Sequence, residues 1–191
     1  MIGTMFLVKC NSGDNSKGKD QLADSTEKLS GDSLNPKAAT DTTKNEMAKY
    51  VEDYKKQCER KINVDTVFLF KGDSFRLVLT HYCLHDNSVH VPQKYTKIYG
   101  LDSFVTHAFK SDLLLKKNNK VIVSKSIQKG DFKKYLDSTL SNYGVVLYPE
   151  IRIMNDEIEI GYSVSIPLTD VGKAVKVSID ENGKIIFGGD K

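Results

Sequence analysis

The sequence predicts a mainly β fold of the α+β class: an antiparallel β-sandwich or partly open barrel of about eight strands, with two short amphipathic helices. Two observations support this prediction. After Arg60, apolar residues recur at every second position through most of the chain, which is typical of strands with one buried face. Short segments containing Gly, Asn or Asp separate these runs, as they do in hairpins. A folded part of roughly 145 residues is large enough to form one core without a metal or a disulfide.

The chain begins with a short apolar run that ends at Cys10, and the sequence then becomes polar. Bacterial lipoprotein leaders have this arrangement, in which the cysteine is diacylated and a flexible tether follows. We therefore interpret residues 1–10 as a truncated or atypical lipoprotein-type leader with Cys10 as the lipid attachment point. Lys9 stands where a small residue is expected, and no basic segment precedes the apolar run. A frayed N-terminus with an incidental cysteine is the alternative.

Residues 11–44 are rich in Ser, Asp, Lys, Thr, Asn and Gly, and their few leucines follow no period. Such a segment buries too little apolar area to offset the entropy of ordering it, so we predict a disordered polar tether. A tether of about 35 residues reaches about 30 Å as a flexible coil. Residues 45–191 are then expected to form a single globular β-rich domain.

The first helix is expected where order begins, in the stretch TTKNEMAKYVEDYKKQCERK. Thr43 and Glu46 have the spacing of a capping box. Apolar residues then recur at three- and four-residue steps, which is typical of an amphipathic helix. The members of this stripe are Met47, Tyr50, Val51, Tyr54 and Cys58. Because the opposite side is charged, we expect the stripe to face the core.

Four hairpins account for most of the remaining chain. Their turns are KGD at 71–73, Asn118–Asn119, Asn155–Asp156 and Asn182–Gly183, the last with the composition of a type I′ turn. Two strands have a regular buried face, formed by Phe75, Leu77, Leu79, His81 and Cys83 in one and by Ile158, Ile160, Tyr162, Val164 and Ile166 in the other. Segment 86–105 alternates weakly, and we interpret it as a long connection with a short strand near 95–99.

The second helix is predicted in GDFKKYLDSTLSNYG, with Asp131 capping its start and Gly144 its end. Its apolar face contains Phe132, Tyr135, Leu136, Leu140 and Tyr143.

The stretches FKSDLLLKKNNKVIVSKSIQKGDFKKYLDSTLSNYGVVLYP and YSVSIPLTDVGKAVKVSIDENGKIIF resemble a family of uncharacterised lipoproteins common in Bacteroidetes, over most of residues 62–187. The resemblance implies a fold and a location in the cell envelope. It implies no activity and no functional residues.

The charge pattern gives no indication of a nucleic-acid partner. The 28 Lys and Arg residues are interleaved with 25 Asp and Glu residues, whereas a nucleic-acid binder usually concentrates its basic charge. No run reaches the roughly 18 apolar residues that span a bilayer as a helix. We therefore expect contact with a membrane through a lipid anchor alone. The predicted location is the cell envelope, as a periplasm-facing or outer-membrane lipoprotein.

Two cysteines remain if Cys10 carries lipid. Cys58 and Cys83 would close a loop of about 25 residues as a disulfide, which is worth about 3 kcal/mol in the chain-entropy model. Two buried free thiols are the alternative.

On a strand, His81, Cys83 and His85 point the same way and offer the ligand types of a zinc or copper site. Same-face neighbours on one strand are about 7 Å apart, so a strand end without metal is the alternative.

An aromatic stretch, QKYTKIYGLDSFVTHAF, contains Tyr95, Tyr99, Phe104 and Phe109, which either line a ligand surface or cover the open end of the sandwich. No catalytic residue and no cofactor is predicted. The sequence favours a non-enzymatic, envelope-anchored binding or scaffolding module for a protein partner, a glycan or a small apolar ligand. The alternative is a small hydrolase or a thiol- or metal-dependent enzyme centred on Cys83 with its two histidines.

Overall fold

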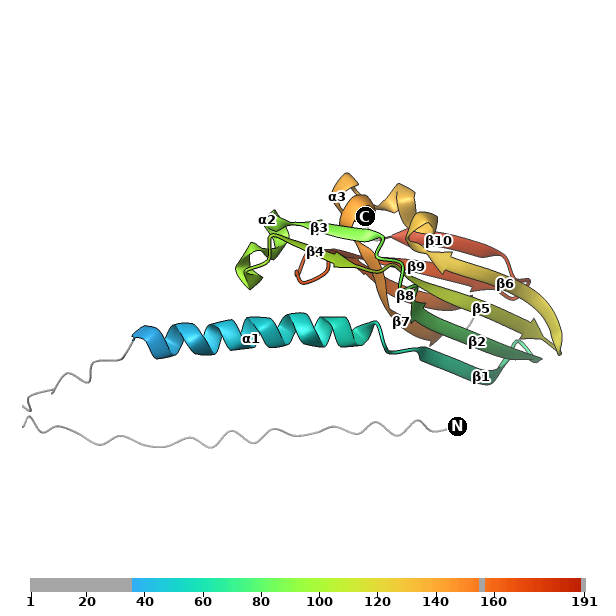
Figure 1. The fold of residues 1–191 in the computed structure, drawn as a ribbon. Coiled ribbons are helices and arrows are strands. Elements are labelled where there is room, and N and C mark those ends of the chain that lie inside the picture. The colour runs from blue at the N-terminus through green and yellow to red at the C-terminus, as the bar shows by residue number, and fades with distance from the viewer. Residues whose placement is uncertain (1–35, 155–156, 190–191) are drawn as a thin grey trace, which may run out of the picture. The chain divides into compact units, whose positions relative to one another are not determined.

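The computed structural model describes residues 36–154 and 157–189 (Figure 1). Lipid attachment at Cys10, the leader and residues 11–35 of the predicted tether therefore lie outside the described residues. The turn predicted at Asn155–Asp156 lies outside them as well.

Two four-stranded antiparallel sheets form the body of the domain (Figure 1). In spatial order, the first sheet contains β1 (Ile62–Phe70), β2 (Asp73–Cys83), β5 (Phe109–Lys117) and β6 (Lys120–Gln128). The second contains β10 (Ile185–Gly189), β9 (Gly172–Asp180), β8 (Glu157–Ser165) and β7 (Val145–Ile153). The predicted mainly β fold is confirmed. Among the described strands no closed barrel forms, so the architecture is that of a sandwich.

The core lies between the sheets, where the predicted alternation is confirmed. All five predicted inward residues of β2 and all five from Ile158 to Ile166 are buried. Phe132 contributes a fully buried ring from the connection between the sheets, with its ring centroid 5.9 Å from that of Tyr162 and 5.4 Å from that of Phe187. Burying a large aromatic side chain removes 150–250 Å² from water. These rings are therefore a major source of stability where the two sheets meet.

The backbone conformation of each hairpin turn depends on which residues occupy it. Asn118 and Asn119 have φ of 47° and 66°, and Lys71 and Gly72 have φ of 50° and 87°, so both turns use two consecutive left-handed residues. The type I′ turn predicted at Asn182–Gly183 is wrong, because only Gly183 has a positive φ. Its N–H donates to the carbonyl of Asp180 at 3.0 Å, which gives a type I turn followed by a left-handed glycine.

An arm, residues 84–108, leaves the first sheet after β2 and returns to it at β5. It contains β3 (Val89–Pro92) and β4 (Ser103–Thr106), paired with each other, with α2 (Gln93–Thr96) and η1 (Lys97–Tyr99) between them. The predicted strand near 95–99 is therefore wrong, since that segment forms two helical turns. Gly100, with φ of 70°, ends them.

The first helix, α1 (Pro36–Gln57), is longer than predicted. It begins with a proline, which is well suited to the first turn because it has no N–H to satisfy. Thr43 and Glu46 lie inside the helix, so the capping-box interpretation is wrong and residues 36–44 of the predicted tether are helical. The inward stripe is confirmed in part: Tyr54 and Cys58 are buried, whereas Tyr50 is 52% exposed.

The chain passes from the first sheet to the second through η2 (Lys129–Tyr135) and α3 (Ser138–Tyr143). The single helix predicted here is wrong, because each segment has its own cap. The N–H of Gln128 donates to Asp131 at 2.9 Å, and the N–H of Leu140 donates to Asp137 at 2.8 Å. Gly144 is extended and does not act as a left-handed cap.

Candidate functional site

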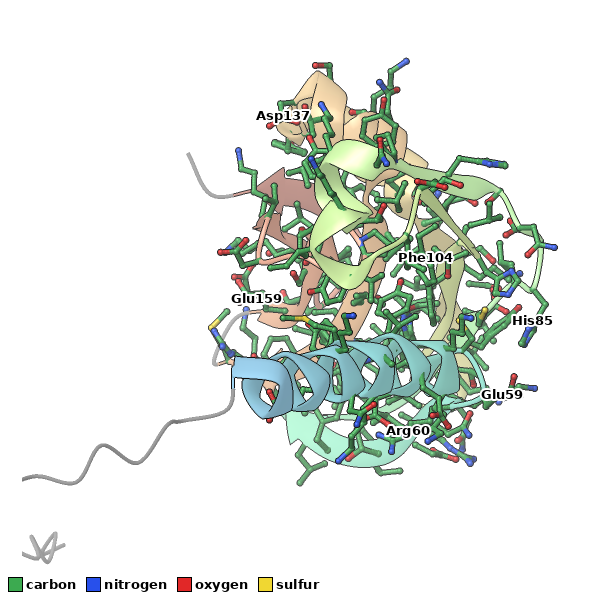
Figure 2. The ribbon with its side chains drawn as sticks, turned by 60° about the vertical axis from the view of Figure 1, so that its left-hand side comes forward. Glu59, Arg60, His85, Phe104, Asp137 and Glu159 are labelled. Carbon is green, nitrogen blue, oxygen red and sulfur yellow. The ribbon has the colours of Figure 1, made fainter. Side chains whose placement is uncertain are left out.

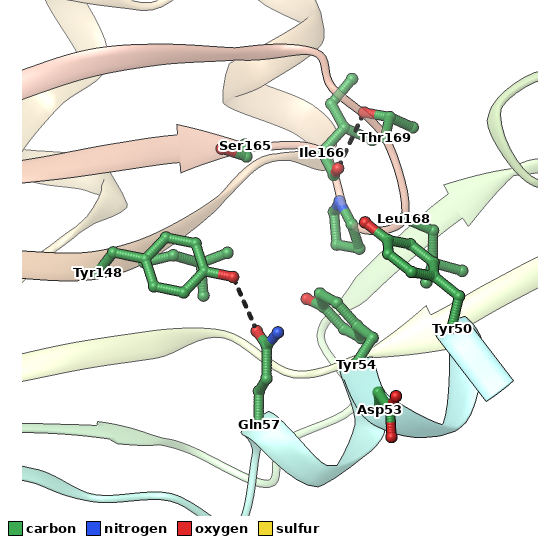
Figure 3. A pocket seen from close by; sticks show the side chains of 11 residues that line it. Tyr50, Asp53, Tyr54, Gln57, Tyr148, Ser165, Ile166, Leu168 and Thr169 are labelled. Atoms are coloured by element: carbon green, nitrogen blue, oxygen red, sulfur yellow. Dashed lines mark hydrogen bonds between the residues drawn. The ribbon is translucent and has the colours of Figure 1, made fainter.

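A hollow follows the flank of α1 and the loop between β8 and β9 (Figure 3). Its cavity volume is about 140 Å³. A shallower hollow of about 490 Å³ adjoins it, and the two share Tyr50, Leu168 and Thr169. We call the combined surface the tyrosine groove, after Tyr50, Tyr54, Tyr99 and Tyr148, which line it.

Tyr148 is held in the groove by a β-bulge. The register between β7 and β8 shifts between Leu147 and Glu150, and Tyr148 has φ of 54°. A left-handed φ in a non-glycine residue costs on the order of 1 kcal/mol and persists where the surroundings impose it. The side chain is 60% exposed, and its hydroxyl donates to Oε1 of Gln57 at 3.2 Å (Figure 3). The bulge thus directs an aromatic ring out of the sheet and towards α1.

The other end of the groove is fixed by Tyr99. Its ring stacks on that of Tyr50, with centroids 5.6 Å apart and planes 8° from parallel. Its hydroxyl donates to the carbonyl of Leu168 at 2.7 Å. Within the same loop, the Thr169 hydroxyl donates to the carbonyl of Ile166 at 3.0 Å (Figure 3). These bonds give the groove a defined floor in the absence of a ligand.

The lining combines aromatic faces with polar groups. Asp53 and Gln57 line it from α1, and Ser165 and Thr169 line it from the opposite side. Two aliphatic side chains at the shallow end, Ile98 and Val171, are 69% and 41% exposed. Lys94 lies there as well, with its ammonium nitrogen 4.7 Å from the centroid of the Tyr95 ring. The shallow end therefore exposes aliphatic side chains and carries both a cation, Lys94, and a carboxylate, Asp170.

The structure separates the four predicted ligand-surface residues into two pairs. Tyr95 and Tyr99 line the shallow end of the groove. Phe104 and Phe109 are each 4% exposed and belong to the core. Tyr50 and Tyr148 were not predicted as groove residues, because their positions in a helix stripe and in a strand gave no indication of exposure. Pro149 lies within the bulge, as is usual for a proline in a strand, but a proline does not reveal the direction of the neighbouring ring.

A second cluster lies where α1 ends. Sγ of Cys58, Sγ of Cys83 and a ring nitrogen of His107 all lie within 4.8 Å of one another. Both cysteines are buried and free, so the disulfide stays a prediction. Burial, reinforced by the neighbouring Cys83 thiol, raises the pKa of Cys58 to about 12. The protonated thiol is therefore the favoured state of Cys58 in the metal-free protein.

The histidines of the predicted metal row lie in different surroundings. His81 is 3% exposed, its Nδ1 lies 3.0 Å from the Ser111 hydroxyl, and its ring stacks on Phe109. His85 lies beyond the end of β2, exposed and with φ of 52°. Among the described residues, the cluster around Cys83 is instead completed by Cys58 and His107. Cys58, Cys83 and His107 come from three separate parts of the chain, so no local sequence pattern connects them.

Comparison with protein-family models and with curated proteins finds no match to this chain. None of the helices in the described part of the chain is long and apolar enough to cross a membrane. Two features remain as indications of function: the tyrosine groove, and the group of Cys58, Cys83 and His107, which we call the thiol cluster.

Proposed function

We propose that the protein is a non-enzymatic binding module whose tyrosine groove binds a glycan. The main support is that three tyrosines, of which two are exposed and Tyr54 is buried, line one hollow together with several polar side chains. Tyr50 and Tyr54 come from α1, and Tyr148 comes from the bulge in β7. A mostly preformed hollow with aromatic faces and a few directed polar groups is the usual form of a small-molecule site.

The composition of the groove suits a polyhydroxylated ligand. Tyrosine rings offer flat amphipathic faces for the C–H surface of a sugar ring. The carboxylate of Asp53 and the amide of Gln57 offer acceptors and donors for sugar hydroxyls. The Thr169 hydroxyl, which donates to Ile166 and accepts from the N–H of Val171, keeps one lone pair for a ligand. A small apolar ligand fits less well, because it would desolvate the Asp53 carboxylate without replacing its hydrogen bonds to water.

The absence of catalysis is part of the proposal and has two supports. Asp53 is the one carboxylate among the described residues that line the 140 Å³ hollow, and Asp170 lines only the adjoining 490 Å³ hollow, whereas glycoside hydrolysis generally uses two carboxyl groups that flank one bond. A nucleophilic cysteine needs a lowered pKa and access to solvent. Cys58 has a raised pKa, and both it and Cys83 are buried.

A glycan array tests the proposal, followed by calorimetric titration of the strongest hit into the purified full-length chain. Tyr148→Ala is expected to weaken binding about tenfold or more, since an aromatic contact is worth on the order of 1 kcal/mol beyond the area that it buries. Tyr82→Ala, which removes a half-buried tyrosine of β2 outside the groove, is the matched control and should bind as the wild type does. If no glycan binds, or if only Tyr82→Ala impairs binding, the proposal is wrong.

The envelope anchor is the second part of the proposal, and it is supported by the sequence of residues 1–44 alone. Incorporation of labelled palmitate into the wild type, and its loss in Cys10→Ala, is the expected result. Label retained by the Cys10→Ala variant would exclude this cysteine as the anchor.

A further inference from the structure

We infer that Cys58, Cys83 and His107 form a structural binding site for a borderline metal ion, for which Zn²⁺ is the best match. The site is separate from the tyrosine groove and does not depend on what the groove binds. Thiolate sulfur and imidazole nitrogen are the ligands that Zn²⁺ prefers in structural sites. With Zn–S bonds of about 2.3 Å, the ligand atoms of a tetrahedral site are about 4 Å apart. The three donor atoms, all within 4.8 Å of one another, are close to that arrangement.

Each ligand has a fixed backbone position. Cys58 directly follows α1, and its N–H donates to the carbonyl of Lys55 at 3.1 Å. Cys83 is the last residue of β2 and is paired with Phe109 of β5. His107 lies between β4 and β5. Because the donors come from three elements, they converge on one point in a way that three residues of one strand do not.

Burial and charge suit a closed structural site. Cys58 is 8% exposed and Cys83 is 4% exposed. On binding, each thiol would lose its proton to solvent, and a divalent cation with two thiolates has no net charge. A neutral centre avoids the large cost of an unpaired charge in the interior. Because the metal competes with two protons, its affinity should rise with pH.

His107 would have to give up one hydrogen bond. Its Nδ1 accepts from the N–H of Asn87 at 3.0 Å. A metal on Nδ1 would replace that N–H. A metal on Nε2 would move the ring proton to Nδ1, where it would face another donor. Metal binding through either nitrogen should therefore break the hydrogen bond from the N–H of Asn87. A change at that N–H would then report metal binding at this site.

His85 is the candidate for the fourth ligand. Its ring centroid is 5.3 Å from that of His107, and two imidazoles on one tetrahedral ion have centroids about 5 Å apart. His85 lies at the surface (Figure 2), and both it and Asn87 have left-handed φ, at 52° and 51°. Release of the Asn87 bond would allow this short loop to shift towards the two sulfur atoms.

A Cys58–Cys83 disulfide would use the same two sulfur atoms. It would require a two-electron oxidant and would leave His107 without a role at the cluster. The third donor within reach of both sulfur atoms is why the structure favours a metal ion.

The test uses the full-length chain, reduced with a phosphine and titrated with Co²⁺, whose thiolate charge-transfer and tetrahedral d–d absorption bands identify the ligands. We expect one equivalent of Co²⁺ to give these bands and Zn²⁺ to displace it. Cys58→Ser, Cys83→Ser and His107→Ala should each weaken Co²⁺ binding by at least about 100-fold, which exceeds the loss usual for changes outside the ligand shell. His85→Ala should reduce the intensity of the tetrahedral bands.

The matched controls are Cys10→Ser, which removes the cysteine outside the described residues, and His90→Ala, which removes an exposed histidine that is not a member of the cluster. Both should bind Co²⁺ as the wild type does. Circular dichroism of every variant separates loss of ligand from loss of fold, and the amide resonance of Asn87 should shift on Zn²⁺ binding. The inference is overturned if the reduced wild type shows no thiolate band. Co²⁺ binding as tight as that of the wild type in the folded Cys58→Ser or Cys83→Ser variant would overturn it as well, and so would an Asn87 resonance that Zn²⁺ leaves unchanged.

Discussion

The buried His81 ring should make the stability of the domain depend on pH. Burial lowers the pKa of His81 from 6.5 to about 4. The unfolded chain therefore binds a proton more readily between these values, and stability falls as pH decreases through this window. At 1.36 kcal/mol per pKa unit, the whole effect is about 3 kcal/mol, of which about 2 kcal/mol is lost between pH 7 and pH 5.

Urea unfolding at pH 7 and pH 5, followed by circular dichroism, measures this loss. His81→Gln keeps a polar partner for Ser111 but has no titrating group. Its free energy of unfolding should change by about 2 kcal/mol less than that of the wild type between the two pH values. Asp65 contributes little in this range, because the hydrogen bond from Arg76 lowers the pKa of its carboxyl group and it titrates below the window. An equal loss in His81→Gln and the wild type would refute the assignment to His81.

Three further changes test the fold, each by urea unfolding at pH 7. Phe75→Ala empties a fully buried position and should cost about 3–5 kcal/mol. Asp137→Ala removes the side chain that accepts from the N–H of Leu140 and should cost about 1 kcal/mol, with no change in the slope against urea. Gly144→Ala places a Cβ 2.6 Å from the carbonyl oxygen of Leu140 and 2.9 Å from Cγ1 of Val164, and should cost about 1–3 kcal/mol. Losses below 0.5 kcal/mol would contradict the packing described at each site.

The sandwich was predictable because side-chain alternation records directly which face of a strand is buried. Phe75 to Cys83 and Ile158 to Ile166 both follow it without a break. Strands of four residues, such as Val89–Pro92 and Ser103–Thr106, are too short to show the period, so the arm was interpreted as a connection.

Helix boundaries were less predictable for a different reason. Residues 36–44 are as polar as a disordered segment, and their composition hides the helical start at Pro36. The stretch from Gln128 to Gly144 has one apolar period but two capping residues, Asp131 and Asp137. Because each cap begins a helix, the stretch forms two short helices instead of one.

The candidate sites were predictable only in fragments. Cys83 and Tyr99 were singled out by the sequence, each from a local pattern, and the structure places them at the thiol cluster and the groove. Their neighbours Tyr50, Cys58 and His107 are brought beside them by tertiary packing over distances along the chain that no periodicity spans. A sequence shows which side chains could bind a ligand or a metal ion. Tertiary packing decides which of them lie side by side.

The arm between β2 and β5 has a consequence for how such a protein diversifies. The two strands that it connects pair directly, so the arm is an insertion that leaves the register of the first sheet intact. Tyr99 and Ile98 of the groove lie on it, and so do His107 of the thiol cluster and the neighbouring His85. Replacing this arm of about 25 residues would therefore change one wall of the groove and the histidines beside the thiols, while Tyr50, Tyr148 and the two cysteines stay with the scaffold.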